Sequence, residues 1–134
     1  MYNNLYEELC DWEVKNFAAV NVLTKGSNFF VEHFSAVSAE VADPEDPGTL
    51  LNTNFISLLQ NVDIIGIAGE ALSHCVANTF RDVADNFGEE NIKKLVLLTD
   101  CSSSVPGFEK LGEQFVKDMT IRGMKTSTSV DFLK

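Results

Sequence analysis

The sequence is poor in the residues that build metal and disulfide sites, and it is poor in positive charge. Its 134 residues include three cysteines, two histidines and no Cys-x-x-Cys pair. We therefore expect neither a disulfide framework nor a zinc site made by this chain alone. Lysine and arginine number 10 against 20 aspartates and glutamates, which gives a net charge of −10. So acidic a chain, without a basic patch, is not expected to bind nucleic acid or an anionic membrane.

Long apolar runs are missing as well. No stretch approaches the roughly 20 apolar residues of a membrane span, and the first residues, MYNNLYEELCDWE, are too acidic and polar for a secretion signal. Three widely spaced cysteines, an odd number, favour the reducing cytoplasm. Hydrophobic residues nevertheless make up 45% of the sequence. We expect residues 1–134 to fold as one globular cytoplasmic domain.

Strand and helix patterns alternate along the chain. Apolar runs predict strands over residues 17–24, 62–68, 94–99 and, more weakly, 126–130. Helical periodicity predicts helices over residues 5–16, 72–87 and 106–122, a further helix that Thr49 caps and that runs to residue 59, and a helical turn around residues 31–41. Such alternation indicates parallel pairing with right-handed crossovers, so we expect a three-layer α/β/α fold with a mostly parallel sheet.

Cys75 stands where such sheets commonly bind ligands. It follows the strand predicted over residues 62–68 and lies in the first turn of the next helix. The positive end of a helix dipole favours the reactive thiolate form of a cysteine. Many cysteines are inert residues of the core, and by position alone this alternative stays open for Cys75.

The segment from Gly69 to Asp82 reads G-x-A-x-x-H-C-V-x-x-T-x-x-D. This pattern closely resembles the nucleophile segment of nicotinamidases and of the wider family of isochorismatase-like cysteine hydrolases. The resemblance implies that Cys75 attacks a carbonyl carbon and that the backbone N–H groups of Ala71 and Cys75 form an oxyanion hole. It also implies a cis peptide bond between Glu70 and Ala71.

A second segment extends the resemblance. Lys25-Gly26, followed by Phe34-Ser35-Ala36, is similar to the family's K-G…Y-S-A-F pattern. In the family the lysine belongs to the catalytic triad and the aromatic residue lines the substrate pocket, so the resemblance implies these roles for Lys25 and Phe34. A cation beside Cys75 would favour its thiolate. By position alone, a lysine at a strand end is more often a solvated flank.

One part of the family pattern is missing. Its third triad member is an aspartate on an early strand, but only 24 residues precede Lys25, and Asp11, the sole aspartate among them, falls in a predicted helix. The resemblance covers roughly residues 10–130, so we expect an isochorismatase-like fold that lacks its N-terminal strand. Some nicotinamidases bind a divalent, zinc-like metal through residues ahead of the lysine motif, so no cofactor is expected from this chain.

Two explanations of the missing part stay open. The chain is either a fragment that starts at an internal methionine or a natural truncation. Loss of a strand would expose a sheet edge or core surface, which would favour a homo-oligomer.

A rival motif overlaps the first one. His74-Cys75-x5-Arg81 matches the H-C-x5-R signature of cysteine phosphatases, whose loop wraps a phosphate with backbone amides. The five intervening residues contain no glycine and have helical periodicity, which would turn Arg81 away from Cys75. The glycines before Cys75 do not have the G-x-G-x-x-G spacing of a dinucleotide site either. Both rivals are therefore disfavoured.

The resemblance implies a cysteine amidohydrolase most similar to nicotinamidases. Such an enzyme would hydrolyse nicotinamide to nicotinate and ammonia through a thioester on Cys75, in NAD salvage and pyridine nucleotide metabolism. The alternative is a catalytically inactive, truncated family member that acts as a binding or interaction module.

Overall fold

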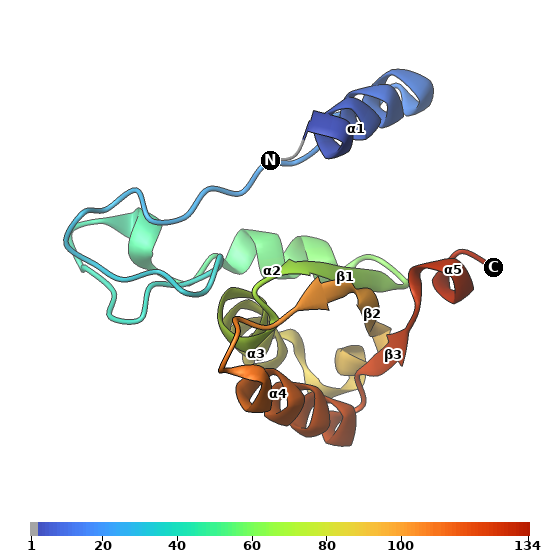
Figure 1. The fold of residues 1–134 in the computed structure, drawn as a ribbon. Helices are drawn as coiled ribbons and strands as arrows, with labels where there is room; N and C mark the ends of the chain where they lie inside the picture. Colours follow the sequence, from blue (N-terminus) through green and yellow to red (C-terminus); the bar gives the residue numbers. More distant parts are fainter. Residues whose placement is uncertain (1–2) are drawn as a thin grey trace.

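A parallel three-stranded sheet forms the centre of the computed structural model, which describes residues 3–134 (Figure 1). The strands are β1 (Ile65–Glu70), β2 (Leu95–Ser103) and β3 (Lys125–Ser127), in the spatial order β1-β2-β3. Both neighbouring pairs are parallel. Each pair is joined by a helical crossover, as the alternating pattern predicts, and the expected α/β class with a parallel sheet is confirmed.

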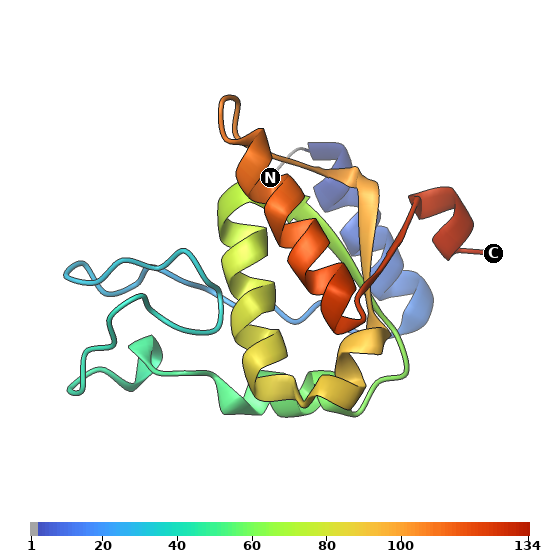
Figure 2. The same cartoon turned by 90° about the horizontal axis from the view of Figure 1, so that it is seen from below.

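Helices surround this sheet unevenly. They are α1 (Asn3–Asn16), α2 (Thr53–Gln60), α3 (Ala77–Phe87), α4 (Glu109–Arg122) and α5 (Ser129–Phe132), with the short helices η1 (Pro47–Thr49), η2 (Leu72–Val76) and η3 (Glu89–Lys94). Figure 2 shows α3 and α4 side by side over one face of the sheet, with α1 beyond the opposite face. None of the residues of α1 is buried. Within residues 3–134, no helix has both the length and the apolar character that crossing a membrane requires.

The hydrophobic core lies between the sheet and the α3–α4 layer. Ile67 and Leu97 point into it from neighbouring positions on β1 and β2, and both are fully buried. Phe87 of α3 and Phe115 of α4 close it from the helical side, also fully buried. Burial of one such side chain contributes about 1.5–3 kcal/mol, so this layer holds most of the hydrophobic stabilisation.

The helix ends follow the expected signals. Gly88 ends α3 with a φ of 86°, and Gly123 ends α4 with a φ of 116°. Only glycine adopts such left-handed backbone angles without strain, which is why these two positions stop the helical periodicity that the sequence predicts. In the interior of α4, Gly112 allows close packing, because an added Cβ would collide with the Ser104 hydroxyl.

The strand predicted over residues 17–24 is wrong. These residues have no regular secondary structure, and the side chain of Phe17 is 99% exposed. A strand requires the backbone hydrogen bonds of a neighbour. The sheet that the structure describes for residues 3–134 comprises only β1, β2 and β3, so no strand pairs with this segment. Ala18 and Val20 instead donate their N–H groups to the carbonyl and carboxylate of Glu13.

Three smaller expectations are also corrected. The helix predicted to follow Thr49 begins at Thr53, because Asn52 caps it by accepting from the N–H of Phe55 at 3.0 Å. Thr49 is buried and donates its hydroxyl to the Asp46 carbonyl instead. The predicted turn around residues 31–41 is not helical, and the last strand stops at Ser127, where Thr128 caps α5.

Candidate active site

Cys75 lies at the carboxyl end of β1, in the helical turn η2 that leads into α3. This turn is π-helical. The carbonyl of Ala71 accepts the N–H groups of His74 at 3.0 Å and Val76 at 3.1 Å, whereas an α-helix would give it the N–H of Cys75. The wide turn therefore separates the N–H of Cys75 from its ordinary helical acceptor.

Lys25 reaches Cys75 from a loop 50 residues away in the sequence. Its Nζ atom is 3.2 Å from the Sγ atom of Cys75, 2.6 Å from the Phe34 carbonyl and 2.9 Å from the His33 carbonyl. The ammonium group has three N–H donors, so these three acceptors use all of them. The two carbonyls hold the cation in place, and the third donor points at the sulfur.

The loop that carries these carbonyls is fastened to α3. The N–H of Ala36 donates to the hydroxyl of Thr79 at 2.9 Å. Ser35 and Val37 on either side are buried, and Val37 joins the hydrophobic core. This attachment lets an irregular segment present Lys25 and Phe34 to η2, the turn that follows β1.

A cavity of about 240 Å³ opens beside the pair. Lys25, Cys75 and Glu70 line it together with apolar residues of β1, η2 and α3, among them Ala68, Val76 and Phe80. The mixture of an apolar wall and a few polar groups is typical of small-molecule sites, and the volume suits a small substrate.

Aromatic rings extend from this point along the loop surfaces. The ring centroid of Phe34 is 6.2 Å from that of His74, and the His74 ring meets Phe108 edge-on at 5.1 Å. Phe34 is 38% exposed, and it lies beside the cavity without lining it. His74 is half-buried and contacts both phenyl rings.

The backbone before Cys75 has an unusual geometry. The peptide bond between Glu70 and Ala71 is cis, at the position where the sequence resemblance places one. Gly69 just before it has a φ of 126°. The carboxylate of Glu70 accepts from the Ser103 hydroxyl, with oxygen distances of 2.9 and 2.8 Å.

Several contacts at this site lie outside what sequence reasoning identified. The buried Ser73 accepts from the N–H of Val105, and its Oγ lies 2.8 Å from Nδ1 of His74. Neither the Ser73–Val105 contact nor the Glu70–Ser103 contact has a local sequence signal, because each joins residues about 30 positions apart. A serine in a first helical turn is an ordinary capping signal and says nothing about Val105.

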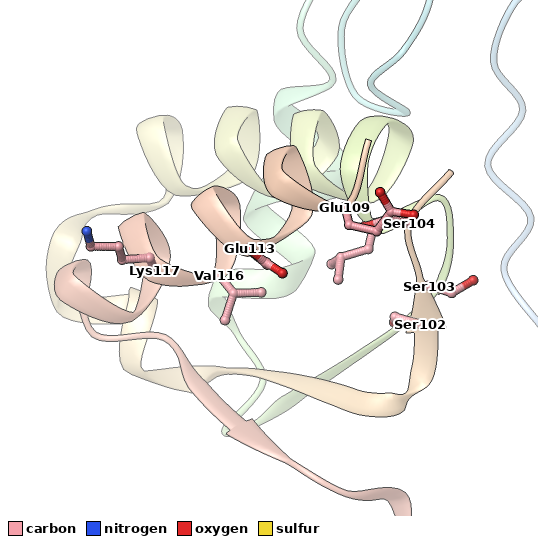
Figure 3. Close-up of a pocket in the computed structure, with 8 residues that line it drawn as sticks. Ser102, Ser103, Ser104, Glu109, Glu113, Val116 and Lys117 are labelled. Atoms are coloured by element: carbon pink, nitrogen blue, oxygen red, sulfur yellow. The ribbon is translucent and has the colours of Figure 1, made fainter. Parts of the chain in front are cut away.

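A larger cavity of about 480 Å³ lies elsewhere, between the end of β2 and α4 (Figure 3). Ser102, Ser103 and Ser104 line it from one side, and Glu109, Glu113 and Lys117 line it from the other. It holds no cysteine or histidine, so it lacks the nucleophile found beside Lys25. Among residues 3–134, no three His, Cys, Asp or Glu side chains are grouped closely enough to bind a metal.

Asp11 forms no hydrogen bond with Cys75 in the part of the chain that the structure describes. It lies on α1 and pairs with Lys15 at 3.5 Å, with both side chains mostly exposed. Cys10, also on α1, is half-buried, and Cys101 is exposed.

Comparison with known proteins gives one informative match. No family model matches the sequence, and a search of the curated proteins finds no match. A solved structure, that of the yeast nicotinamidase Pnc1p, matches with a TM-score of 0.59 at 15% sequence identity. The fold is isochorismatase-like. The match covers 90% of this chain and 50% of the yeast protein, so the chain spans about half the length of the protein it resembles.

Proposed function

We propose that the chain is a cysteine hydrolase of carboxamides, with nicotinamide as its substrate. The observation that carries this proposal is the contact of 3.2 Å between Lys25 Nζ and Cys75 Sγ at the carboxyl end of β1. Open α/β sheets bind their ligands at this edge. The small cavity around the pair adds support from an independent feature.

In the proposed reaction, the thiolate of Cys75 attacks the carboxamide carbon. A C–S bond forms, and the carbonyl oxygen becomes an oxyanion that accepts from the N–H groups of Ala71 and Cys75. The intermediate then collapses, its C–N bond breaks, and the nitrogen leaves as ammonia after taking up a proton. Water attacks the resulting thioester, which releases nicotinate and restores the thiol.

Lys25 and Phe34 have supporting roles in this scheme. The Lys25 ammonium attracts the thiolate and orients it, because two backbone carbonyls fix its position. The ring of Phe34 stacks on the pyridine ring of the substrate from beside the cavity. In the family, an aspartate with no counterpart in this sequence moves the proton, so the rate of this chain depends on whichever base replaces it.

Substitution of Cys75 tests the proposal. Cys75→Ala should abolish the release of ammonia from nicotinamide, while Cys101→Ala, which removes an exposed cysteine outside the cavity, should retain the wild-type rate. Mass spectrometry should find the trapped acyl group on Cys75 alone. If Cys75→Ala still released ammonia from nicotinamide, Cys75 would not be the nucleophile and the proposed function would be wrong.

One observation favours a second candidate, a binding or interaction module without catalysis. Phe29 and Phe30, on the loop between Lys25 and Phe34, are almost fully exposed and pack only edge-on against each other. Exposed aromatic pairs are common at protein–protein interfaces. Three results together would support this candidate over the enzyme. The chain unfolds cooperatively, it releases no ammonia from nicotinamide, and an alkylating reagent modifies Cys75 no faster than Cys101.

A further inference from the structure

Two hydrogen-bonded contacts connect the residues around Ala71, where β1 leads into η2, to the end of β2 and the residues just after it. The Ser103 hydroxyl donates to the carboxylate of Glu70, and the N–H of Val105 donates to the hydroxyl of Ser73 at 3.0 Å. Glu70 immediately precedes Ala71, and Ser73 lies between Ala71 and Cys75. The two contacts therefore attach to the turn on either side of Ala71.

The pairing of β1 with β2 is interrupted in a way that creates the first contact. Ile67 pairs with Leu97, and the next pair is Gly69 with Ser102, so four residues of β2 stand opposite the single residue Ala68. Pairing then continues with Glu70 opposite Ser103. Figure 3 shows the side chain of Ser103 pointing away from α4. The irregularity thus returns β2 to β1 at the residue that precedes Ala71.

The second contact has a buried acceptor, the Ser73 side chain. Ser73 is only 5% exposed, and its Oγ accepts from Val105 while it lies 2.8 Å from Nδ1 of His74. A buried hydroxyl with both partners satisfied fixes the groups that it joins, because breaking either bond would leave a polar atom unpaired. Ser73 therefore fixes the first turn of the helix relative to the segment that leads to Phe108.

We propose that Ser73 and Ser103 are positioning residues that hold the backbone N–H groups of Ala71 and Cys75 in the geometry of an oxyanion hole. The proposal rests on the proposed function, in which these two amides bind the oxyanion. Donors stabilise a developing charge well only when they are already in place, and a small displacement of such groups lowers the rate strongly. The segment from Ser103 to Val105 is the brace that keeps them there.

Kinetics on nicotinamide give the first test. Ser73→Ala and Ser103→Ala should each lower kcat about tenfold and leave KM within about threefold, because the oxyanion develops during the chemical step and is absent from the bound substrate. Ser103→Thr, which keeps the hydroxyl, should recover the rate. Ser102→Ala is the matched control, since the Ser102 hydroxyl has no hydrogen-bond partner among residues 3–134. Ser103 is exposed, so its alanine variant is expected to fold. Equal rates for Ser103→Ala and Ser102→Ala would overturn the proposal.

An aldehyde probe separates this proposal from the proposed function. Pyridine-3-carbaldehyde can add to the Cys75 thiolate, which forms a C–S bond and converts the carbonyl oxygen into an alkoxide within the same hole. Its dissociation constant should rise about tenfold in Ser103→Ala, while alkylation of Cys75 by iodoacetamide, which creates no oxyanion, should keep its rate. An unchanged dissociation constant would contradict the brace.

A chain that neither hydrolyses nicotinamide nor binds the aldehyde would refute the proposed function but not the brace. In that case, the NMR chemical shifts of the Ala71 and Cys75 backbone amides provide the test. Relative to wild type, these shifts should change more in Ser73→Ala and Ser103→Ala than in Ser102→Ala. Equal spectra for the three variants would overturn the brace as well.

Discussion

The two halves of the chain differ sharply in how their residues are buried. Among the described residues before Leu51, α1 buries nothing, and Val37 and Ala39 are the only buried hydrophobic residues. From Leu51 onward, the chain supplies the sheet, the helices α2 to α5 and every other core residue. The candidate site draws on both halves, since Lys25 comes from the first and Cys75 from the second. The nucleophile thus stands on a packed element, and the cation is brought to it by a loop.

A few polar contacts join the halves near the site. The N–H of Ala36 donates to Thr79, and the N–H of Asn52 donates to the Val37 carbonyl at 2.7 Å. Segments with few buried contacts open at a lower free energy than the core does. We therefore expect core substitutions in the second half to lower stability, and substitution of Lys25 in the first half to lower activity without a loss of stability.

The largest expected effect is on stability in the second half. Phe87→Ala removes a fully buried ring and should lower the free energy of unfolding by about 3–5 kcal/mol. Phe29→Ala is the matched control, because Phe29 is 93% exposed in the first half, and it should change the stability by less than about 0.5 kcal/mol. Urea denaturation followed by circular dichroism measures both. A comparable loss in the two variants would show that the halves are equally packed.

The next effect is on activity and comes from the first half. Lys25→Met should lower kcat/KM for nicotinamide about 100-fold, or about 2.7 kcal/mol, because the cation at Cys75 Sγ is lost. Its unfolding midpoint should stay at the wild-type value. Lys15→Met, a lysine on the exposed helix α1, should change neither quantity. A loss of stability equal to the loss of activity would mean that Lys25 is a structural residue.

The second half was also the more predictable from sequence. Strand β1, the helix after it, and the stops at Gly88 and Gly123 were all expected, because each depends on local periodicity or on one residue's backbone freedom. The position of Cys75 followed from these elements. Lys25 was identified through a motif, since nothing local could indicate a contact across 50 residues.

Non-local pairing explains what the sequence could not predict. Residues 17–24 have the composition of a strand, but a strand forms only beside a partner, and none lies there in the described chain. The bonds of Ser73 with Val105 and of Ser103 with Glu70 depend on the interrupted pairing of β1 with β2. Periodicity carries no information about such an interruption.

A smaller effect is expected at the junction of the halves. Asn52→Ala removes the side chain that caps α2 by accepting from the N–H of Phe55, and it should lower stability by about 1 kcal/mol. Asn54→Ala, one residue inside the same helix, should be neutral or slightly stabilising, since alanine is the best helix former. Urea denaturation of the two variants provides the measurement. Equal stabilities would show that the cap does not hold the start of the packed half.

The smallest effect is a pH dependence that separates the halves. Hydrogen bonds from the hydroxyl and N–H of Ser129 hold the pKa of the Asp100 carboxyl below its ordinary value. Because the pKa is lower in the folded chain, the stabilisation is present above the unfolded pKa of about 3.9 and is lost as the pH falls through the folded value. Urea midpoints of wild type and Asp100→Asn should therefore differ at neutral pH and converge in acid.

Asp11→Asn on α1 is the counterpart of that variant in the first half. Among residues 3–134, Lys15 is the only hydrogen-bond partner of the Asp11 side chain, on a helix that buries nothing, so the loss of this carboxylate should leave the unfolding midpoint unchanged. A pH-dependent shift in Asp11→Asn as large as that in Asp100→Asn would mean that α1 unfolds together with the sheet. The difference between the halves would then lie in surface exposure alone and not in cooperativity, and the loop that carries Lys25 would be as firmly held as the turn that carries Cys75.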